Sequence, residues 1–212
     1  MSFASKYLKT YNFISFIFWS HILLTTLRDV YTVLSPKAAL EDKIRNIYVL
    51  GLYTRAFPHS VLTCVQVFCS TMEVLHSLVG LVRAPLGSVL LQSFARLLIT
   101  VGICYQVPSS PGNYNFVAFT AMSVAWSLTD MIRYFYYMRS SSLMLRWLRY
   151  SAFIVLYPIG LSCEPYIVYL TLSKVQGGYY YFLCACLLAY IPGFLYLYGY
   201  MWKQRGRILN SN

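Results

Sequence analysis

Long apolar runs dominate the pattern of hydrophobic and polar positions along the chain. They fall at residues 11–27, 61–82, 88–105, 116–138, 147–172 and 179–201. A helix needs about 20 mostly apolar residues to cross a hydrocarbon core about 30 Å thick. Membrane β-strands would instead alternate apolar and polar residues over about ten positions, and stretches such as 183–188 do not alternate. The pattern predicts an all-α polytopic membrane protein, a six-transmembrane-helix bundle.

Composition supports a bilayer as the solvent. The 212 residues are 58% hydrophobic and 11% charged, whereas a soluble domain is about one quarter charged. We find no soluble segment, repeat or low-complexity tract, so residues 1–212 are interpreted as one transmembrane domain. The net charge of +11 then indicates membrane topology and contact with anionic lipids rather than a nucleic-acid partner.

Basic residues between the runs predict the orientation, because Lys and Arg in short flanking loops stay on the cytosolic side. One side would carry Lys6, Lys9, Arg83, Arg139, Arg146, Arg149, Lys203, Arg205 and Arg207. The other side has no charge over 106–114 and only Lys174 in its last loop, although the first connection, 28–60, holds five basic residues. We therefore expect both termini to be cytosolic.

Three of the six acidic residues, Glu73, Asp130 and Glu164, lie inside predicted spans. Ionisable groups in a bilayer are costly and commonly functional. The alternative is that they join helices through hydrogen bonds or ion pairs. The six cysteines lie in apolar runs without Cys-x-x-Cys spacing, which favours small buried hydrophobic residues over metal ligands. No metal site is predicted.

Spacing suggests how the polar residues are arranged. Glu73 and His76 are three residues apart, as are Asp130 and Arg133, so each pair can meet on one helix face. For Asp130 and Arg133 we favour a structural ion pair. A rise of about 1.5 Å per residue places Glu73, His76, Asp130 and Tyr157 in one layer, roughly 10–15 Å below the flanking arginines. We therefore predict that Glu73, His76, Asp130 and Arg133 form a polar layer that supports the site, with Tyr157 at the same depth.

Tyr157 and Glu164 are seven residues apart in the fifth run and therefore share one helix face. Pro158 and Gly160 lie between them. Proline removes a helix hydrogen bond and can kink the axis. The spacing predicts a cavity between the two side chains.

At these residues the chain resembles the 3-hydroxyacyl-CoA dehydratase family, also called protein tyrosine phosphatase-like or PASTICCINO-type proteins. The most specific part is Tyr-Pro-x-Gly-x-x-x-Glu at 157–164. Further matching segments lie at 7–12, 72–76, 80–85, 126–127, 132–134, 148–151, 191–194 and 200–205. This resemblance implies a six-helix enzyme of the endoplasmic reticulum membrane, with Tyr157 and Glu164 as the catalytic pair. Two departures are Asp130, where the family usually has glutamate, and Pro165, where an aliphatic residue is common.

The implied reaction converts a very-long-chain 3-hydroxyacyl-CoA to the trans-2-enoyl-CoA, the third step of fatty acid elongation. Dehydration needs one group to remove a proton and another to help the hydroxyl leave. Tyr157 and Glu164 could serve in either order, and no cofactor is required. The condensing enzyme, the ketoacyl reductase and the enoyl reductase of the same cycle are the implied protein partners.

Arginines are candidates for the phosphates of CoA. The first candidates are Arg83, Arg96 and Arg149, and Arg139 and Arg146 are the second choice. The alternative for each is a topology signal whose head reaches water at the membrane surface.

Three other functions can be compared with the residues of the chain: a tyrosine phosphatase, a scaffold and a transporter. A tyrosine phosphatase needs an arginine six residues after its nucleophilic cysteine, and no cysteine here has one. A non-catalytic scaffold of the elongation enzymes is the main alternative, although the chain retains both Tyr157 and Glu164. A transporter could relay protons through Glu73, His76 and Asp130, but no pair of interrupted helices in matching halves supports it.

Overall fold

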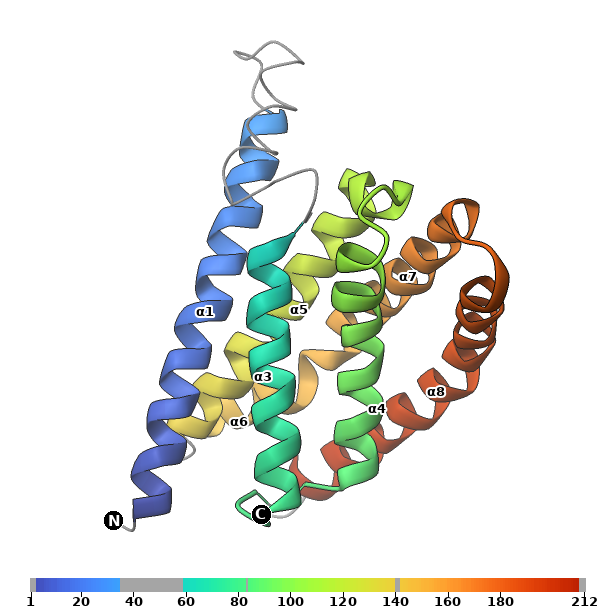
Figure 1. The fold of residues 1–212 in the computed structure, drawn as a ribbon. Coiled ribbons are helices and arrows are strands. Elements are labelled where there is room, and N and C mark those ends of the chain that lie inside the picture. The colour runs from blue at the N-terminus through green and yellow to red at the C-terminus, as the bar shows by residue number, and fades with distance from the viewer. Residues whose placement is uncertain (1–2, 35–58, 83, 140–141, 210–212) are drawn as a thin grey trace.

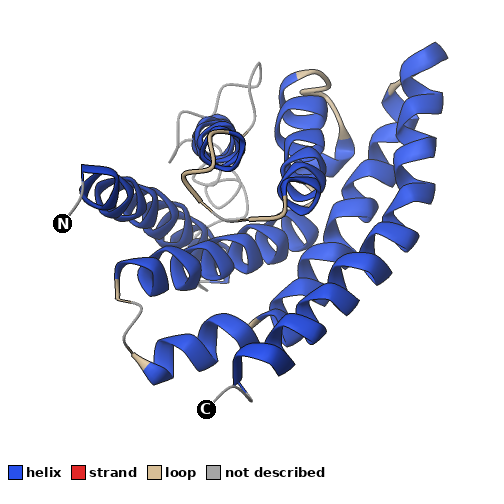
Figure 2. Cartoon of the chain, turned by 90° about the horizontal axis from the view of Figure 1, so that it is seen from below, coloured by secondary structure: helices blue, strands red, loops and turns tan. Residues whose placement is uncertain are grey.

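A computed structural model describes residues 3–34, 59–82, 84–139 and 142–209. Within these ranges the secondary structure is helical, and no strand occurs in them (Figure 2). The all-α prediction is therefore confirmed. Each of the six apolar runs lies largely within a helix.

The helices form one bundle (Figure 1). In chain order they are α1 (Phe3–Leu34), α3 (Ser60–Leu78), α4 (Leu86–Leu97), the π-helical η1 (Leu98–Tyr105), the 3-10 turn η2 (Pro111–Tyr114), α5 (Phe116–Met138), α6 (Leu143–Ser151), α7 (Phe153–Thr171), the 3-10 turn η3 (Leu172–Lys174) and α8 (Gly177–Leu209). The first and last helices extend well beyond the predicted runs. α1 begins and α8 ends at the same end of the bundle, which we call the terminal end.

Five helical segments of the described chain are long and apolar enough to cross a membrane. They are α1, α3, α4 with η1, the segment Leu143–Lys174, and α8. The predicted span 116–138, which is α5, is not among them. Its buried face carries polar side chains such as Ser123, Ser127 and Asp130, which lower its hydropathy. The chain is thus a multi-pass membrane protein by its apolar helices.

α5 lies at the centre of the packing. Its most extensive contacts are with α1 and α7, and Trp19, Met122 and Ile167 on these three helices are fully buried. Apolar side chains such as Leu24 and Leu188 are instead exposed on the outside of the bundle. An apolar exterior around a partly polar interior suits a protein surrounded by lipid, because polar side chains avoid hydrocarbon.

Polar contacts join the helices at the end of the bundle opposite the terminal end, which we call the distal end. The Asn115 side chain accepts a hydrogen bond of 3.0 Å from the Ala118 amide and begins α5. Gly112 packs directly on α7, where a Cβ atom would lie 2.7 Å from the Ile167 carbonyl oxygen. Only glycine permits this approach of η2 to α7.

Candidate active site

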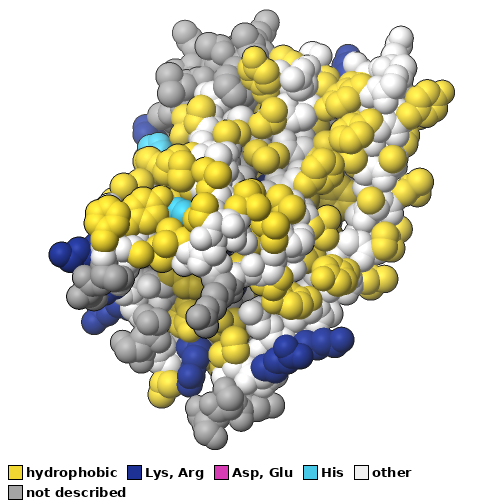
Figure 3. All heavy atoms as spheres, turned by 60° about the horizontal axis from the view of Figure 1, so that its bottom comes forward, with side chains coloured by type: hydrophobic (Ala, Val, Ile, Leu, Met, Phe, Trp, Pro, Cys, Tyr) yellow, Lys and Arg dark blue, Asp and Glu magenta, His cyan; other side chains and the backbone are white. Residues whose placement is uncertain are grey.

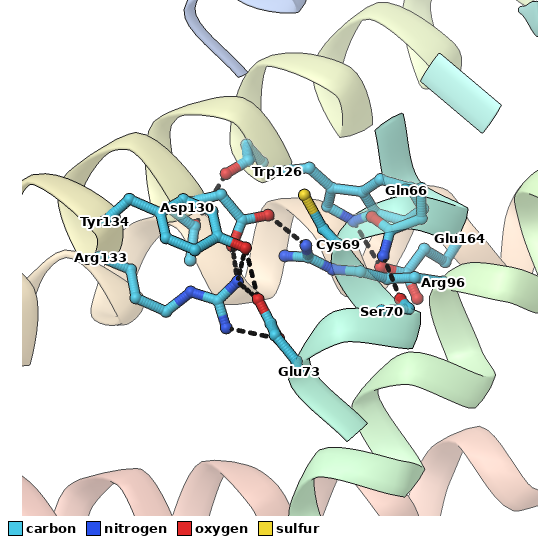
Figure 4. Close-up of polar contacts among 12 residues, drawn as sticks. Gln66, Cys69, Ser70, Glu73, Arg96, Trp126, Asp130, Arg133, Tyr134 and Glu164 are labelled. Carbon is cyan, nitrogen blue, oxygen red and sulfur yellow. Dashed lines mark hydrogen bonds and ion pairs between the residues drawn. The ribbon is translucent and has the colours of Figure 1, made fainter. Parts of the chain in front are cut away.

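Glu73 of α3 is bound by two residues of α5 (Figure 4). Arg133 Nη1 donates a hydrogen bond of 2.9 Å to Glu73 Oε2, and Arg133 Nη2 pairs with Oε1. The Tyr134 hydroxyl also donates to Oε1, at 2.5 Å. This fork-shaped pairing of guanidinium and carboxylate is among the stronger polar contacts in proteins. It joins α3 to α5 inside the bundle.

Asp130 is 1% exposed and pairs with two arginines. Arg133 Nη2 lies 2.7 Å from Asp130 Oδ1, which confirms the ion pair predicted from the three-residue spacing. Arg96 of α4 pairs with Oδ2. The Arg96 guanidinium also lies 5.0 Å from the Trp126 ring and 5.8 Å from the Trp19 ring, distances typical of cation–π contacts. Arg96 is therefore held within the bundle.

Glu164 of α7 is buried and is held by neutral donors. Trp126 Nε1 donates a hydrogen bond of 2.8 Å to Glu164 Oε1, and the Tyr190 hydroxyl donates one of 3.3 Å to Oε2. Among the described residues Glu164 forms no ion pair. Glu73 and Asp130, by contrast, are each paired directly with arginine. Glu164 is thus the carboxyl group of this site that is not committed to a cation.

The charges of the clustered acidic and basic side chains also distinguish Glu164 from Glu73 and Asp130. Among the described residues, three carboxyl groups, of Glu73, Asp130 and Glu164, share this cluster with two guanidinium groups, of Arg96 and Arg133. With three possible negative charges and two positive ones, the cluster is neutral when one carboxyl group carries a proton. A charge without a partner is costly to bury. Glu164, which has no arginine of its own, is the group best suited to exchange that proton.

Tyr157 lies on α7 beside α8. Its ring stacks on Phe194 and Tyr198, with centroids 5.7 Å and 6.0 Å away. The ring is half-buried, and within the described chain its hydroxyl has no hydrogen-bond partner. Tyr157 and Glu164 are seven residues apart on α7, so the two side chains share one helix face. Among the described residues the Tyr157 side chain is thus held by ring stacking and not by its hydroxyl.

Gly160 leaves room between Tyr157 and Glu164 on the same face of α7. A Cβ atom at Gly160 would lie 3.7 Å from Glu164 Oε1 and 3.7 Å from Trp126 Nε1. These are ordinary van der Waals distances, so a methyl group fits there but a longer side chain would project toward the carboxylate. Gly160 is therefore a buried position between the two predicted catalytic groups, packed against Trp126.

His76 lies apart from the predicted polar layer. It is buried on α3 and makes a 2.9 Å hydrogen bond with the Tyr7 hydroxyl of α1. Its ring also meets Tyr11 edge to face at 4.8 Å. Among the described residues no hydrogen bond or ion pair joins His76 to Glu73. The polar layer is thus divided, with Glu73, Asp130 and Arg133 in one network and His76 against α1.

Of the predicted CoA-binding arginines, the two that the structure describes, Arg96 and Arg149, lie in different parts of the bundle. Arg83 lies outside the described residues, and Arg96 is in the interior network. Arg149 of α6 lies near the terminal end; its Nε is buried and has no hydrogen-bond partner among the described residues. Arg205 of α8 donates a 3.2 Å hydrogen bond to Ser151 at the end of α6. Figure 3 shows Lys and Arg side chains along the lower rim of a largely hydrophobic surface.

Two residues that contact Glu164 were not selected from the sequence. Trp126 precedes Asp130 by four residues, so their shared helix face was a usable signal. Tyr190 lies on α8, 26 residues after Glu164, and its spacing carries no such signal. The chain has 21 tyrosines, and only the packing of α8 against α7 distinguishes this one.

Comparison with known proteins identifies relatives along nearly the whole chain. Residues 67–211 match the family model described as protein tyrosine phosphatase-like protein, PTPLA. The very-long-chain (3R)-3-hydroxyacyl-CoA dehydratase PASTICCINO 2 of Arabidopsis thaliana is 30% identical, covering 97% of this chain and 94% of the relative. A dehydratase of the same description from Caenorhabditis elegans is 29% identical, covering 98% and 96%. A probable one from Schizosaccharomyces pombe is 31% identical, covering 96% and 92%.

No solved structure matches the chain. The family assignment therefore depends on the sequence relatives, and it agrees with the resemblance inferred from residues 157–164. The matched region contains Glu73, Asp130, Tyr157 and Glu164, which the fold places on α3, α5 and α7. The chain belongs to the protein tyrosine phosphatase-like (PTPLA) family, and its relatives from these three organisms are named as very-long-chain 3-hydroxyacyl-CoA dehydratases.

Proposed function

We propose that this protein is a membrane-bound hydro-lyase that dehydrates very-long-chain 3-hydroxyacyl-CoA to trans-2-enoyl-CoA. The names of its relatives support the reaction and the substrate class. The structural observation that carries the proposal is the position of Glu164. It is a buried carboxyl group held by neutral donors, on the same helix face as Tyr157, whose hydroxyl has no hydrogen-bond partner in the part of the chain that the structure describes.

The proposed chemistry uses these two groups. Glu164 removes the proton on C2 of the acyl chain, and the electrons of that C–H bond form the C2–C3 double bond. The C3–O bond breaks, and the Tyr157 hydroxyl donates the proton with which the hydroxyl group leaves as water. The proton on Glu164 then returns to the phenolate through solvent, so the enzyme is unchanged. General acid–base catalysis of this kind typically contributes about 10²–10⁴-fold.

We also propose that α5 crosses the membrane, which completes a six-helix topology. α1 begins and α8 ends at the terminal end (Figure 1). A chain that begins and ends on one side must cross an even number of times, and the five apolar segments alone would not return it. The basic residues near this end favour a cytosolic location for both termini.

The placement of the basic residues and of Tyr157 also suggests where the substrate binds. We propose that the CoA phosphates lie at the terminal end, near Arg149 and Arg205, and that the acyl chain enters the bundle past Tyr157. Arg149 and Arg205 lie on helices that meet near this end, where Arg205 bonds to Ser151, and guanidinium groups are suited to bind phosphate. Residence in the endoplasmic reticulum and association with the condensing enzyme and the two reductases of elongation belong to this proposal.

The direct test is turnover by the purified protein in detergent. A very-long-chain 3-hydroxyacyl-CoA is supplied, and the 2-enoyl product is measured by mass spectrometry. Tyr157→Phe and Glu164→Gln each keep the shape of the side chain but remove the proton-transfer group. Each is expected to lower kcat by at least about a hundredfold. Tyr169→Phe is the matched control, because Tyr169 is on the same helix but 62% exposed.

Two results would contradict the proposal. The first is a folded wild-type protein with no turnover of any 3-hydroxyacyl-CoA, which would instead favour the scaffold role. The second is full turnover in both Tyr157→Phe and Glu164→Gln, which would remove them as the catalytic pair. Detergent size-exclusion profiles and thermal unfolding establish that each variant is folded.

A further inference from the structure

An apolar groove of about 840 Å³ lies between α4–η1 and the beginning of α8. Its side walls include Phe94, Leu97, Val101 and Phe182. Polar groups, among them Lys174, line its distal end. The volume is within the range of about 300–1,000 Å³ usual for small-molecule sites. The groove has a polar end and an apolar body.

The walls of the groove are tied together at its distal end. The Tyr179 hydroxyl donates a 2.5 Å hydrogen bond to the Gly102 carbonyl in the π-helical segment η1. A Cβ atom at Gly102 would lie 3.1 Å from this hydroxyl, so glycine permits the contact. The Tyr179 ring stacks on Phe182, which meets Phe94 edge to face at 6.5 Å. α4–η1 and α8 therefore meet there through aromatic side chains.

The groove begins in the layer of the candidate active site. Phe94 and Leu97, which line it, flank Arg96 of the Glu164 network in sequence. On α8, Tyr190 contacts Glu164, and the lining residues Phe182 and Tyr179 lie eight and eleven residues closer to the distal end. At 1.5 Å per residue these steps are about 12 Å and 16 Å. The same two helices thus contribute to the site and extend beyond it as the groove.

We propose that this groove binds the methyl-terminal part of the substrate's acyl chain, and that its polar end limits the chain length. The inference rests on the proposed function. With the CoA phosphates at the terminal end and the reacting carbons beside Glu164, the remaining acyl chain points toward the distal end. The groove lies in that direction, on the helices that already carry Arg96 and Tyr190.

The polar end provides the physical limit. Among the described residues Lys174 forms no ion pair, so a hydrocarbon chain that reaches it would remove water from an unpaired ammonium group. Burying that charge without a partner is costly. Each methylene added before the chain reaches Lys174 gains apolar contact with the groove. Each methylene beyond that point instead adds to the cost of removing water from the ammonium group. The preferred length is set where the two effects balance.

The test measures chain-length selectivity rather than activity alone. Wild-type protein and Val101→Trp are compared with medium-chain and very-long-chain 3-hydroxyacyl-CoA. The tryptophan fills the middle of the groove, so the ratio of kcat/KM for the very long substrate to that for the medium one is expected to fall about tenfold. This corresponds to about 1.4 kcal/mol, or the burial of about two methylene groups. Leu188→Trp is the matched control, on α8 but 75% exposed and outside the groove.

A second variant acts in the opposite direction and does not depend on how the tryptophan packs. Lys174→Leu makes the end of the groove apolar and is expected to raise the ratio for the longest substrates. An unchanged ratio in folded Val101→Trp and Lys174→Leu would overturn the inference. If added phospholipid stabilises the wild type but not Val101→Trp while the ratio stays constant, the occupant is a membrane lipid instead. Failure of the proposed function is distinct, because no substrate of any length would then react.

Discussion

Trp126 donates a 2.8 Å hydrogen bond through its indole nitrogen to the carboxylate of Glu164. The same ring lies against the guanidinium of Arg96 at 5.0 Å. Trp126 therefore contacts both Glu164 and Arg96, and its hydrogen bond fixes the position of the carboxylate. A direct ion pair would hold Glu164 as a charged group that is less able to accept a proton.

Trp126→Phe is expected to lower kcat more than it changes KM. Phenylalanine keeps most of the packing but cannot donate to Glu164. A hydrogen bond to a charged group contributes about 1.5–3 kcal/mol, so kcat should fall by roughly one to two orders of magnitude. Tyr190→Phe removes the longer bond, 3.3 Å, and its effect should be smaller. Steady-state kinetics measure both, with Trp147→Phe at an exposed position as the control. Equal kcat in Trp126→Phe and wild type would be inconsistent with this role.

Asp130→Asn is expected to destabilise the fold more than Glu164→Gln does. Asp130 is paired with Arg96 and Arg133, and breaking a buried ion pair from one side costs about 3–5 kcal/mol. Glu164 has no arginine partner among the described residues, so its neutralisation leaves none of their cations unpaired. Thermal unfolding in detergent compares the two variants directly. The reverse order of stability would refute the distinction between a structural and a reactive carboxyl group.

Gly160→Leu is expected to lower kcat/KM by about a hundredfold or more, because its side chain would occupy the surface between Tyr157 and Glu164 where substrate must bind. Gly160→Ala should retain activity, since the added Cβ atom makes only ordinary contacts at 3.7 Å. The matched control is Gly193→Leu, at a glycine of α8 where an added Cβ atom would have no neighbouring atom within 4 Å. Similar losses in Gly160→Leu and Gly193→Leu would argue against this explanation.

The stability of the folded protein is expected to depend on pH through His59, which precedes α3 at the distal end. Burial against Phe119, whose ring stacks on the imidazole at 3.4 Å, lowers the pKa of His59 to about 4, although its hydrogen bond to the Asn113 carbonyl opposes the shift. The ordinary pKa is about 6.5. Because the folded pKa is the lower one, the unfolded chain binds the proton first. The stability that depends on neutral His59 is complete above pH 6.5 and declines as the pH falls toward 4.

The measurement is thermal unfolding between pH 7 and pH 4. His59→Gln, which can still donate to the Asn113 carbonyl but does not titrate, is expected to show a flatter decline than the wild type. His21→Gln, at an exposed histidine of α1, is the control and should keep the wild-type slope. If His59→Gln and wild type lose stability in parallel, another group accounts for the decline.

Several features of the site could be read from residue spacing. The ion pair between Asp130 and Arg133 follows from their separation of three residues in a helix, because that separation brings side chains to one face. Tyr157, Gly160 and Glu164 share a face of α7 for the same reason. The partners of Glu73 could not be found this way. Spacing suggested His76, whereas Arg133 and Tyr134 from α5 bind the carboxylate.

The sequence by itself determined that the chain is helical, membrane-embedded and a member of its family. Apolar length and the scarcity of charge decide the first two, because a bilayer tolerates few alternatives to helices, and the segment 157–164 indicates the third. Only the tertiary structure decided which acidic residues are neutralised by arginine and which is not. That distinction depends on side chains of α3, α4 and α7 meeting those of α5, and on α8 meeting α7. Such contacts between distant segments leave no periodic signal along one helix.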